Sequence, residues 1–203
     1  MDYPNDRLQV YTYAQILEAM GQLDGQSLLD AGCGWGVFSM LAYFLGASPV
    51  GVDFVPDTIQ TLRKVHPMVR WEVADCGEPD QLLSLGVFDR VAAVEILQYL
   101  DFQTGIANLW QLVASGGRLV GCVPNSLCPF ARGVQRRLNG WIPVAPEDIS
   151  RAAGALPGCS ELHMKGLAYR EDQAFVPYST SGWESEITGT PNRIVFALLR
   201  TAQ

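Results

Sequence analysis

Three glycines at alternate positions are the residues whose type and spacing point most directly to ligand chemistry. Gly32, Gly34 and Gly36 follow the short apolar segment 28–31 and precede a second apolar run. Glycine permits the backbone torsions of a tight turn and lets a ligand approach the main chain closely. The amide groups at the N-terminus of a following helix add partial positive charge. An ordinary strand-to-helix turn also favours glycine, but this spacing favours a site for a nucleotide-type ligand.

Acidic residues stand at the ends of four predicted strands. These strands span residues 27–31, 49–54, 69–74 and 88–94, and the acidic residues are Asp30, Asp53, Asp75 and Glu95. In an open parallel sheet, ligands bind beyond the carboxyl ends of the strands. Any one of the four carboxylates can instead cap a helix or carry a solvated charge. Their occurrence at four strand ends favours a shared site.

Three of these carboxylates match the groups of one ligand. Asp53 is suited to accept hydrogen bonds from a ribose diol. Asp75 can accept from the exocyclic amine of adenine, and Asp30 can face the ammonium of an amino acid. A ligand that offers all three groups is S-adenosylmethionine.

Strands alternate with helical segments along the chain, which predicts right-handed crossovers and a mostly parallel sheet. The helix at 37–45 is apolar on every side, so we expect it to be buried deep in a layered fold. Asp57 is expected to cap the next helix, with Ile59, Leu62 and Val65 facing inward. Further helices are predicted at 8–20, 102–113 and 147–156, further strands at 118–123, 161–169 and 193–201, and a loop at 170–192.

Four segments resemble motifs of the Rossmann-like, class I S-adenosylmethionine-dependent methyltransferases. They are the glycine-rich turn at 28–36, the second strand at 50–53, the segment 74–76 and the Gly-Gly segment at 112–119. The resemblance implies an α/β, three-layer αβα sandwich around a mostly parallel seven-stranded sheet whose last strand is antiparallel. It also implies S-adenosylmethionine as cofactor, bound by Asp30, Gly32, Cys33, Gly34, Gly36, Asp53, Phe54, Asp75, Cys76 and Glu95.

The segment after the fourth predicted strand resembles the E-x-L-E-H segment of the quinone-biosynthesis O-methyltransferases. Glu95 matches, but Gln98 and Tyr99 stand where that pattern has Glu and His. We therefore expect neither a histidine base nor a metal here, and take Glu95 and Tyr99 as the candidate catalytic residues. Tyr99 can orient a substrate hydroxyl, or it can be a packing residue. An oxygen acceptor is favoured slightly over nitrogen, carbon or sulfur.

The acceptor is expected to be a small molecule held by the irregular parts of one methyltransferase domain, residues 1–203. This domain divides into an N-terminal helical lid (1–25), a cofactor-binding core (26–125), a substrate-side insertion (126–146) and a C-terminal helix with the last strands (147–203). Candidate substrate-binding residues are Tyr11, Tyr99, Asn125, Arg132 and Arg136. The arginines of the insertion can receive an anionic substrate, contact a membrane surface or form a solvated helix face.

Composition excludes several classes of protein. The chain is 48% hydrophobic and 17% charged, as in soluble globular domains, and its net charge of -7 disfavours nucleic-acid binding. The five cysteines lack C-x-x-C spacing, the N-terminus does not read as a signal peptide, and the longest apolar run is too short to span a bilayer. We therefore expect a cytoplasmic protein without stable membrane insertion, while the oligomeric state stays open.

Two alternative functions stay open. A nicotinamide dehydrogenase needs a third glycine where this chain has Val37, and the pyrophosphate of its cofactor would be repelled by Asp30. A non-catalytic module that binds S-adenosylmethionine would retain the same glycines and carboxylates.

Overall fold

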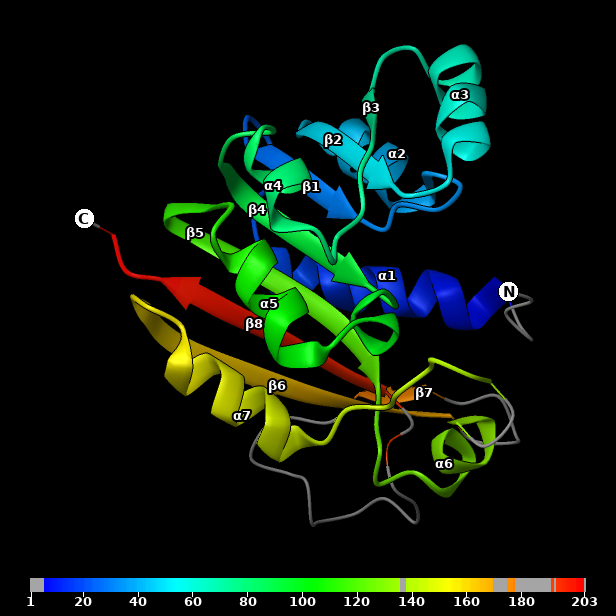
Figure 1. Cartoon of the computed structure of the whole chain (residues 1–203), viewed down its shortest axis with the longest axis vertical. Coiled ribbons are helices and arrows are strands. Elements are labelled where there is room, and N and C mark those ends of the chain that lie inside the picture. Colours follow the sequence, from blue (N-terminus) through cyan, green and yellow to red (C-terminus); the bar gives the residue numbers. More distant parts are fainter. Residues whose placement is uncertain (1–5, 136–137, 170–174, 178–190, 192, 203) are drawn as a thin grey trace.

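A mostly parallel β-sheet lies between two layers of helices (Figure 1). The computed structural model describes residues 6–135, 138–169, 175–177, 191 and 193–202. The strands follow the order β3-β2-β1-β4-β5-β8-β6-β7. Their bounds are β1 (Ser27–Ala31), β2 (Ser48–Asp53), β3 (Arg70–Val73), β4 (Phe88–Val94), β5 (Val113–Pro124), β6 (Cys159–Tyr169), β7 (Phe175–Pro177) and β8 (Arg193–Arg200).

The sheet confirms the predicted α/β class and adds one short strand. Strands β1 to β5 are parallel, whereas β8 runs antiparallel to both β5 and β6. These seven strands form the expected sheet, with the last one antiparallel. The eighth, β7, pairs residues 175–177 with 167–169 of β6, in a region predicted to be a loop. A three-residue strand is too short for alternation of apolar and polar residues to indicate it.

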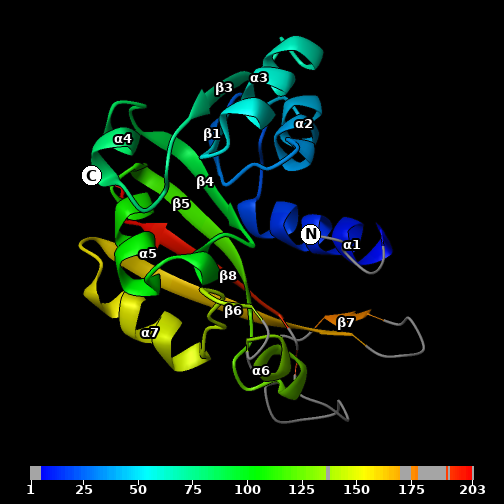
Figure 2. The same cartoon turned by 45° about the vertical axis from the view of Figure 1, so that its right-hand side comes forward.

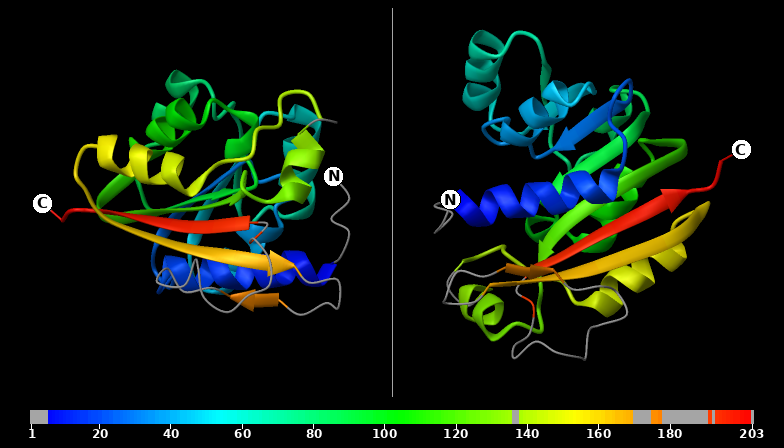
Figure 3. Two further views of the ribbon diagram at one scale, coloured as in Figure 1. Left: turned by 90° about the horizontal axis from the view of Figure 1, so that it is seen from below. Right: turned by 180° about the vertical axis from the view of Figure 1, so that it is seen from behind.

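Helices cover both faces of the sheet (Figures 2 and 3). One layer holds α1 (Asp6–Met20), α2 (Val37–Phe44) and α3 (Pro56–Val65), and the other holds α4 (Pro79–Leu83), α5 (Phe102–Trp110) and α7 (Pro146–Ala155). Because side chains alternate along a strand, Ala92 of β4 packs toward α1 and α2, whereas Val91 and Ala93 pack toward α5. The short 3-10 helix η1 (Leu97–Tyr99) follows β4, and α6 (Pro129–Gln135) lies beyond the carboxyl end of β5.

The composition of helix α2 predicted burial on every side, but the helix is buried on one face only. Phe38 and Ala42 are buried against the sheet, but Leu41 is 37% exposed and Phe44 is 75% exposed. A helix in an outer layer meets the sheet with one face only, so its other face contacts solvent whatever its composition. No helix in the described part of the chain is long and apolar enough to cross a membrane.

Helix α3 differs from its prediction at both ends. Its N-cap residue is Val55 and Pro56 is the first helical residue, so Asp57 lies within the first turn and does not cap it. Proline suits that position because its missing N–H has no partner there. Ile59 and Leu62 are buried as expected, but Val65 is 57% exposed at the end of the helix.

Strand β5 starts earlier than predicted and carries an irregularity. Its pairing with β4 shifts between Phe88 with Val113 and Arg90 with Arg118. Gly116 has a φ of 72°, and a Cβ on Gly117 would lie 2.8 Å from the backbone oxygen of Asp89. The two glycines therefore form a bulge within the strand and do not end the preceding helix, which stops at Trp110.

The carboxyl end of α1 is held by two arginines from the sheet. Arg118 Nη1 donates to the Ala19 oxygen at 2.9 Å, and Arg90 Nε donates to the Met20 oxygen at 2.8 Å. Cations stabilise the partial negative charge at this end of a helix. Ile16 and Met20 are fully buried in the same region, so the C-terminal half of α1 is fixed to the sheet.

Candidate functional site

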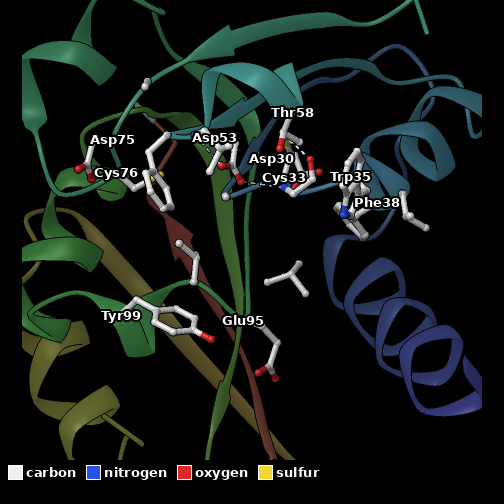
Figure 4. Close-up of a pocket in the computed structure, with 18 of the residues that line it drawn as sticks. Asp30, Cys33, Trp35, Phe38, Asp53, Thr58, Asp75, Cys76, Glu95 and Tyr99 are labelled. Atoms are coloured by element: carbon white, nitrogen blue, oxygen red, sulfur yellow. Dashed lines mark hydrogen bonds between the residues drawn. The ribbon is translucent and has the colours of Figure 1, made fainter. Parts of the chain in front are cut away.

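A cavity of about 810 Å³ opens at the carboxyl ends of β1 to β4 (Figure 4). Its volume lies within the roughly 300–1,000 Å³ typical of small-molecule sites. Ten of the predicted site residues line it: Asp30, Gly32, Cys33, Gly34, Asp53, Phe54, Asp75, Cys76, Glu95 and Tyr99. The cavity is also lined by ten residues outside that set, namely Tyr13, Trp35, Val37, Phe38, Val55, Thr58, Ala74, Val94, Ile96 and Leu100.

The three glycines of the turn all need the left-handed conformation, with φ values of 70°, 50° and 74°. A Cβ on Gly32 would lie 2.8 Å from Ile96, and one on Gly36 would lie 2.5 Å from the ring of Trp71. A Cβ on Gly34 would meet nothing within 4 Å. Gly34 therefore leaves space for a ligand, whereas Gly36 lies outside the cavity lining and permits packing on Trp71.

Asp53 fixes the shape of the turn. Its Oδ2 accepts a hydrogen bond from the Gly34 amide at 3.0 Å, and its Oδ1 accepts one from the Val55 amide at 3.0 Å. Each carboxylate oxygen has capacity for a second donor, such as a ribose hydroxyl. Phe54 follows Asp53, lines the same cavity and is 65% exposed to solvent.

Asp30 is a buried carboxyl group in the wall of the cavity. It is 1% exposed, and its Oδ2 accepts a hydrogen bond from Ser39 Oγ at 2.6 Å. Burial raises the pKa of Asp30 to about 6; hydrogen bonds from Ser39 oppose this rise, and the charge of Asp53 adds to it. A carboxylate desolvated in this way favours a cationic ligand group beside it.

The adenine end predicted from the sequence lies at β3. Asp75 is exposed, its Oδ1 accepts from the Gly77 amide at 2.8 Å, and its own amide donates to Gln81. Cys33 and Cys76 are buried; burial raises the pKa of Cys76 to about 12 and that of Cys33 further. Both thiols are therefore protonated and serve as apolar parts of the wall.

Glu95 is held by a network that the sequence did not indicate. It is 9% exposed, and its Oε1 accepts a hydrogen bond from Arg193 Nε at 2.5 Å. Gln98 Nε2 donates to Oε2 at 3.1 Å, and the Cys122 thiol lies 3.6 Å from Oε1. Arg193 stands 98 residues along the chain at the start of β8, and no local pattern marks it as a partner of Glu95.

Two tyrosines face the part of the cavity near Glu95. Tyr99 is 40% exposed; partial burial and then the charge of Glu95 raise its pKa, while Arg193 lowers it. Burial, followed by the charge of Asp30, raises the pKa of Tyr13 to about 12, and its hydroxyl accepts from Gln9 at 3.0 Å. Both phenols are therefore protonated near neutral pH and can donate hydrogen bonds.

The predicted substrate-binding residue Tyr11 does not line the cavity. Tyr11 packs against the apolar cluster between α1 and the sheet, while Tyr13 reaches the cavity. Two residues that are two positions apart on a helix point to different sides. The helical period therefore decides which of the two tyrosines can contact a ligand.

Two further predicted substrate-binding residues, Asn125 and Arg132, also lie outside the cavity lining. Asn125 is fully buried; its Nδ2 donates to the Pro191 oxygen at 2.8 Å and its Oδ1 accepts from the Leu127 amide at 3.0 Å. Both polar atoms of the Asn125 side chain are therefore occupied by hydrogen bonds to the backbone. Arg132 is exposed on α6, and Arg136 falls outside the described residues. In the part of the chain that the structure describes, no group of three or more His, Cys, Asp or Glu side chains could hold a metal ion.

Comparisons with known proteins agree with this geometry. Residues 28–117 match a family model described as a methyltransferase domain. The chain is 28% identical to a mitochondrial ubiquinone biosynthesis O-methyltransferase of Bos taurus, over 89% of this chain and 56% of that protein. It is 38% identical to a ribosomal protein L11 methyltransferase of Burkholderia multivorans, over 47% of this chain and 31% of that protein. The chain thus spans only 31% and 56% of the lengths of these two relatives.

The solved structures show the same fold. A SAM-dependent methyltransferase from Archaeoglobus fulgidus superposes with a TM-score of 0.73 at 17% identity, covering 95% of this chain and 94% of that one. The chain therefore has the fold of these methyltransferases, and its residues 28–117 are similar to a methyltransferase domain.

Proposed function

We propose that this chain is a class I S-adenosylmethionine-dependent methyltransferase that passes the methyl group to an oxygen atom of a small organic acceptor. The observation that carries the proposal is the charge of the cavity. Among the described residues, the charged ones that line it are all acidic: Asp30, Asp53, Asp75 and Glu95. This wall complements a ligand that carries a sulfonium and an ammonium. It would repel the pyrophosphate of a nicotinamide dinucleotide, which makes the dehydrogenase alternative weaker.

The positions of the carboxylates suggest how the cofactor lies. Asp53 and Asp75 follow β2 and β3, so the adenosine belongs at that end of the cavity. Asp30, in β1, receives the ammonium. The transferable methyl then lies toward Glu95 and Tyr99, which Figure 4 shows on the other side of the cavity from Asp75.

Methyl transfer is a direct displacement, so the protein mainly aligns the two reactants. In this proposal Tyr99 donates a hydrogen bond that orients the acceptor. Glu95, held by Arg193, acts as a fixed negative charge beside the reacting atoms and not as a free base. An acceptor oxygen that is already deprotonated, such as a carboxylate or an acidic phenol, needs no base.

The length of the matches supports a small acceptor. The ubiquinone biosynthesis O-methyltransferase aligns over 89% of this chain, while the ribosomal protein L11 methyltransferase aligns over 47%. We further infer that residues 1–25 form a lid, that residues 126–146 lie on the acceptor side, and that the protein works in the cytoplasm. All five cysteines are free thiols, as expected in a reducing compartment.

Calorimetry followed by an acceptor screen tests the proposal. S-adenosylmethionine and S-adenosylhomocysteine should bind and raise the melting temperature, while nicotinamide dinucleotides should not. Phenols, carboxylates and amines are then incubated with S-adenosylmethionine, and release of S-adenosylhomocysteine is measured. Stabilisation by a nicotinamide dinucleotide alone would refute the cofactor assignment, and turnover of amines alone would refute the oxygen acceptor.

A further inference from the structure

The backbone of Glu95 adopts a conformation that side chains rarely take. Within the described residues, Glu95 is the one non-glycine residue with positive φ, at 56°. Such conformations persist only where the surroundings hold them, and they are concentrated at ligand sites. Glu95 lies directly after β4 and lines the cavity on the side where the proposed function puts the methyl group.

The Glu95–Arg193 ion pair explains how this conformation is held. The two side chains are 7% and 16% exposed, so both charges are largely removed from water. Strand β5 separates the strands that carry them, so the pair crosses the carboxyl end of β5, where Cys122 contacts the same carboxylate. A desolvated pair of this kind is costly unless its geometry is nearly ideal, and it is often retained because it fixes one arrangement.

Gln98 also holds Glu95, and it brings a second buried hydrogen-bond acceptor to the network. Its Nε2 donates to the backbone oxygen of Glu95 at 2.9 Å and to the carboxylate at 3.1 Å. Its Oε1 is buried and has no hydrogen-bond donor among the described residues. Gln98 and Arg193 therefore restrain the Glu95 carboxylate from two different parts of the fold.

We propose that Arg193 is a positioning residue: through Glu95, it fixes a negative hydrogen-bond acceptor opposite the transferable methyl. The site then selects ligands that place a positive charge or a donor hydrogen at that point. This inference rests on the proposed function, because it needs the cofactor to lie with its sulfonium toward β4. Arg193 does not itself touch the reacting atoms.

Two cofactor analogues test the proposal without knowledge of the acceptor. S-adenosylhomocysteine is neutral at the sulfur, whereas sinefungin carries an ammonium where the methyl group stands. The ratio of their affinities, measured by calorimetry at pH 7.5, reports the electrostatic potential at the position of the methyl group. It also reports whether a hydrogen-bond acceptor lies there. The wild type is compared with Glu95→Gln, Arg193→Gln, Arg193→Lys and the double variant. Arg200→Gln is the matched control, because Arg200 lies on the same strand and bonds backbone oxygens at its far end.

The preference for sinefungin should fall about tenfold in Glu95→Gln, since a charge-assisted hydrogen bond is lost. This preference should fall at least threefold in Arg193→Gln and by a smaller factor in Arg193→Lys. In the double variant it should fall no further than in Glu95→Gln, because Arg193 acts through Glu95. Arg200→Gln should lower the melting temperature and leave the ratio unchanged. If Arg193→Gln does not fold, Arg193→Lys carries the comparison.

An unchanged ratio in the Arg193 variants, with a reduced ratio in Glu95→Gln, would overturn the positioning role. A raised ratio would also overturn it, since Arg193 would then only neutralise Glu95. Additive effects in the double variant would mean that Arg193 does not act through Glu95. Failure of the wild type to bind S-adenosylhomocysteine would be a different result, because it would refute the proposed function itself.

Discussion

The two ends of the cavity are built in different ways. At the cofactor end, Asp30 to Gly36 form one continuous stretch, and the bond from Gly34 to Asp53 joins residues 19 positions apart. At the acceptor end, Glu95 meets Arg193 across 98 positions, and Tyr13 comes from a separate helix. The first end depends on backbone conformations that glycine allows, and the second on side chains brought together by the whole fold. Substitutions at the two ends should therefore fail in different ways.

The largest effect is expected from Gly36→Ala. The new Cβ would need a left-handed backbone and would lie 2.5 Å from the ring of Trp71, so we expect a loss of about 4 kcal/mol of unfolding free energy. Gly34→Ala is the matched control, because its Cβ meets nothing and only the backbone strain of about 1 kcal/mol applies. Urea unfolding measures both. Equal losses would show that packing does not distinguish the two glycines.

A pH-dependent effect should follow from Asp30. The pKa of this group is about 6 in the folded protein and 3.8 ordinarily, so the folded state holds a proton that the unfolded chain releases between these values. Stability from this group therefore decreases as the pH rises from about 4 to 6, by about 3 kcal/mol in total. Asp30→Asn should remove this slope and be more stable at pH 7. Urea unfolding at several pH values measures it, and an unchanged slope would contradict the assignment.

Asp30 should also link pH to cofactor binding. The ionised form attracts the ammonium, so the affinity for S-adenosylhomocysteine should rise as the pH increases through about 6, and Asp30→Asn should flatten this rise. Calorimetry in buffers of different ionisation enthalpy detects the proton that is released. Binding that is independent of pH in the wild type would exclude Asp30 from the ammonium site.

Asp53→Ala should reduce the affinity for S-adenosylhomocysteine by roughly 10- to 100-fold. The change removes the ribose acceptor and also the partner of the Gly34 amide, each a hydrogen bond to a charged group. Asp57→Ala, four residues later in the first turn of α3, is the control and should bind normally. Calorimetric titration compares the two. A similar loss in both variants would mean that general charge, and not the turn, determines affinity.

The smallest effect is expected from Arg132→Ala. Arg132 is exposed on α6 and lies outside the cavity lining, so cofactor affinity should change by less than about twofold, as is typical of surface substitutions. Once an acceptor is known, its Michaelis constant should rise by no more than about threefold. A large increase for an anionic acceptor would show that α6 contributes to the acceptor end directly.

The same contrast explains how much could be predicted from the sequence. The strands β1 to β4 and the convergence of the strand-end carboxylates on one cavity were predicted, because glycines, strand-end carboxylates and apolar runs are local features. Arg193 was missed because its partner is distant, and Asn125 was misassigned because a loop residue that holds the chain resembles one that binds a ligand. The burial of α2 was overestimated because composition does not show whether a helix lies in an outer layer.

The anchoring of α1 has a mechanical consequence. Arg90 and Arg118 donate hydrogen bonds to the last turn of this helix, while Val10, near its other end, is 68% exposed. When a helix is held at one end, rotation about that end displaces each residue in proportion to its distance from it. Tyr13 lies part of the way along α1 and lines the cavity, so a rotation of the helix about its last turn would displace the Tyr13 hydroxyl. Amide hydrogen exchange should therefore be slowest in the last turn of α1 and become faster toward its first.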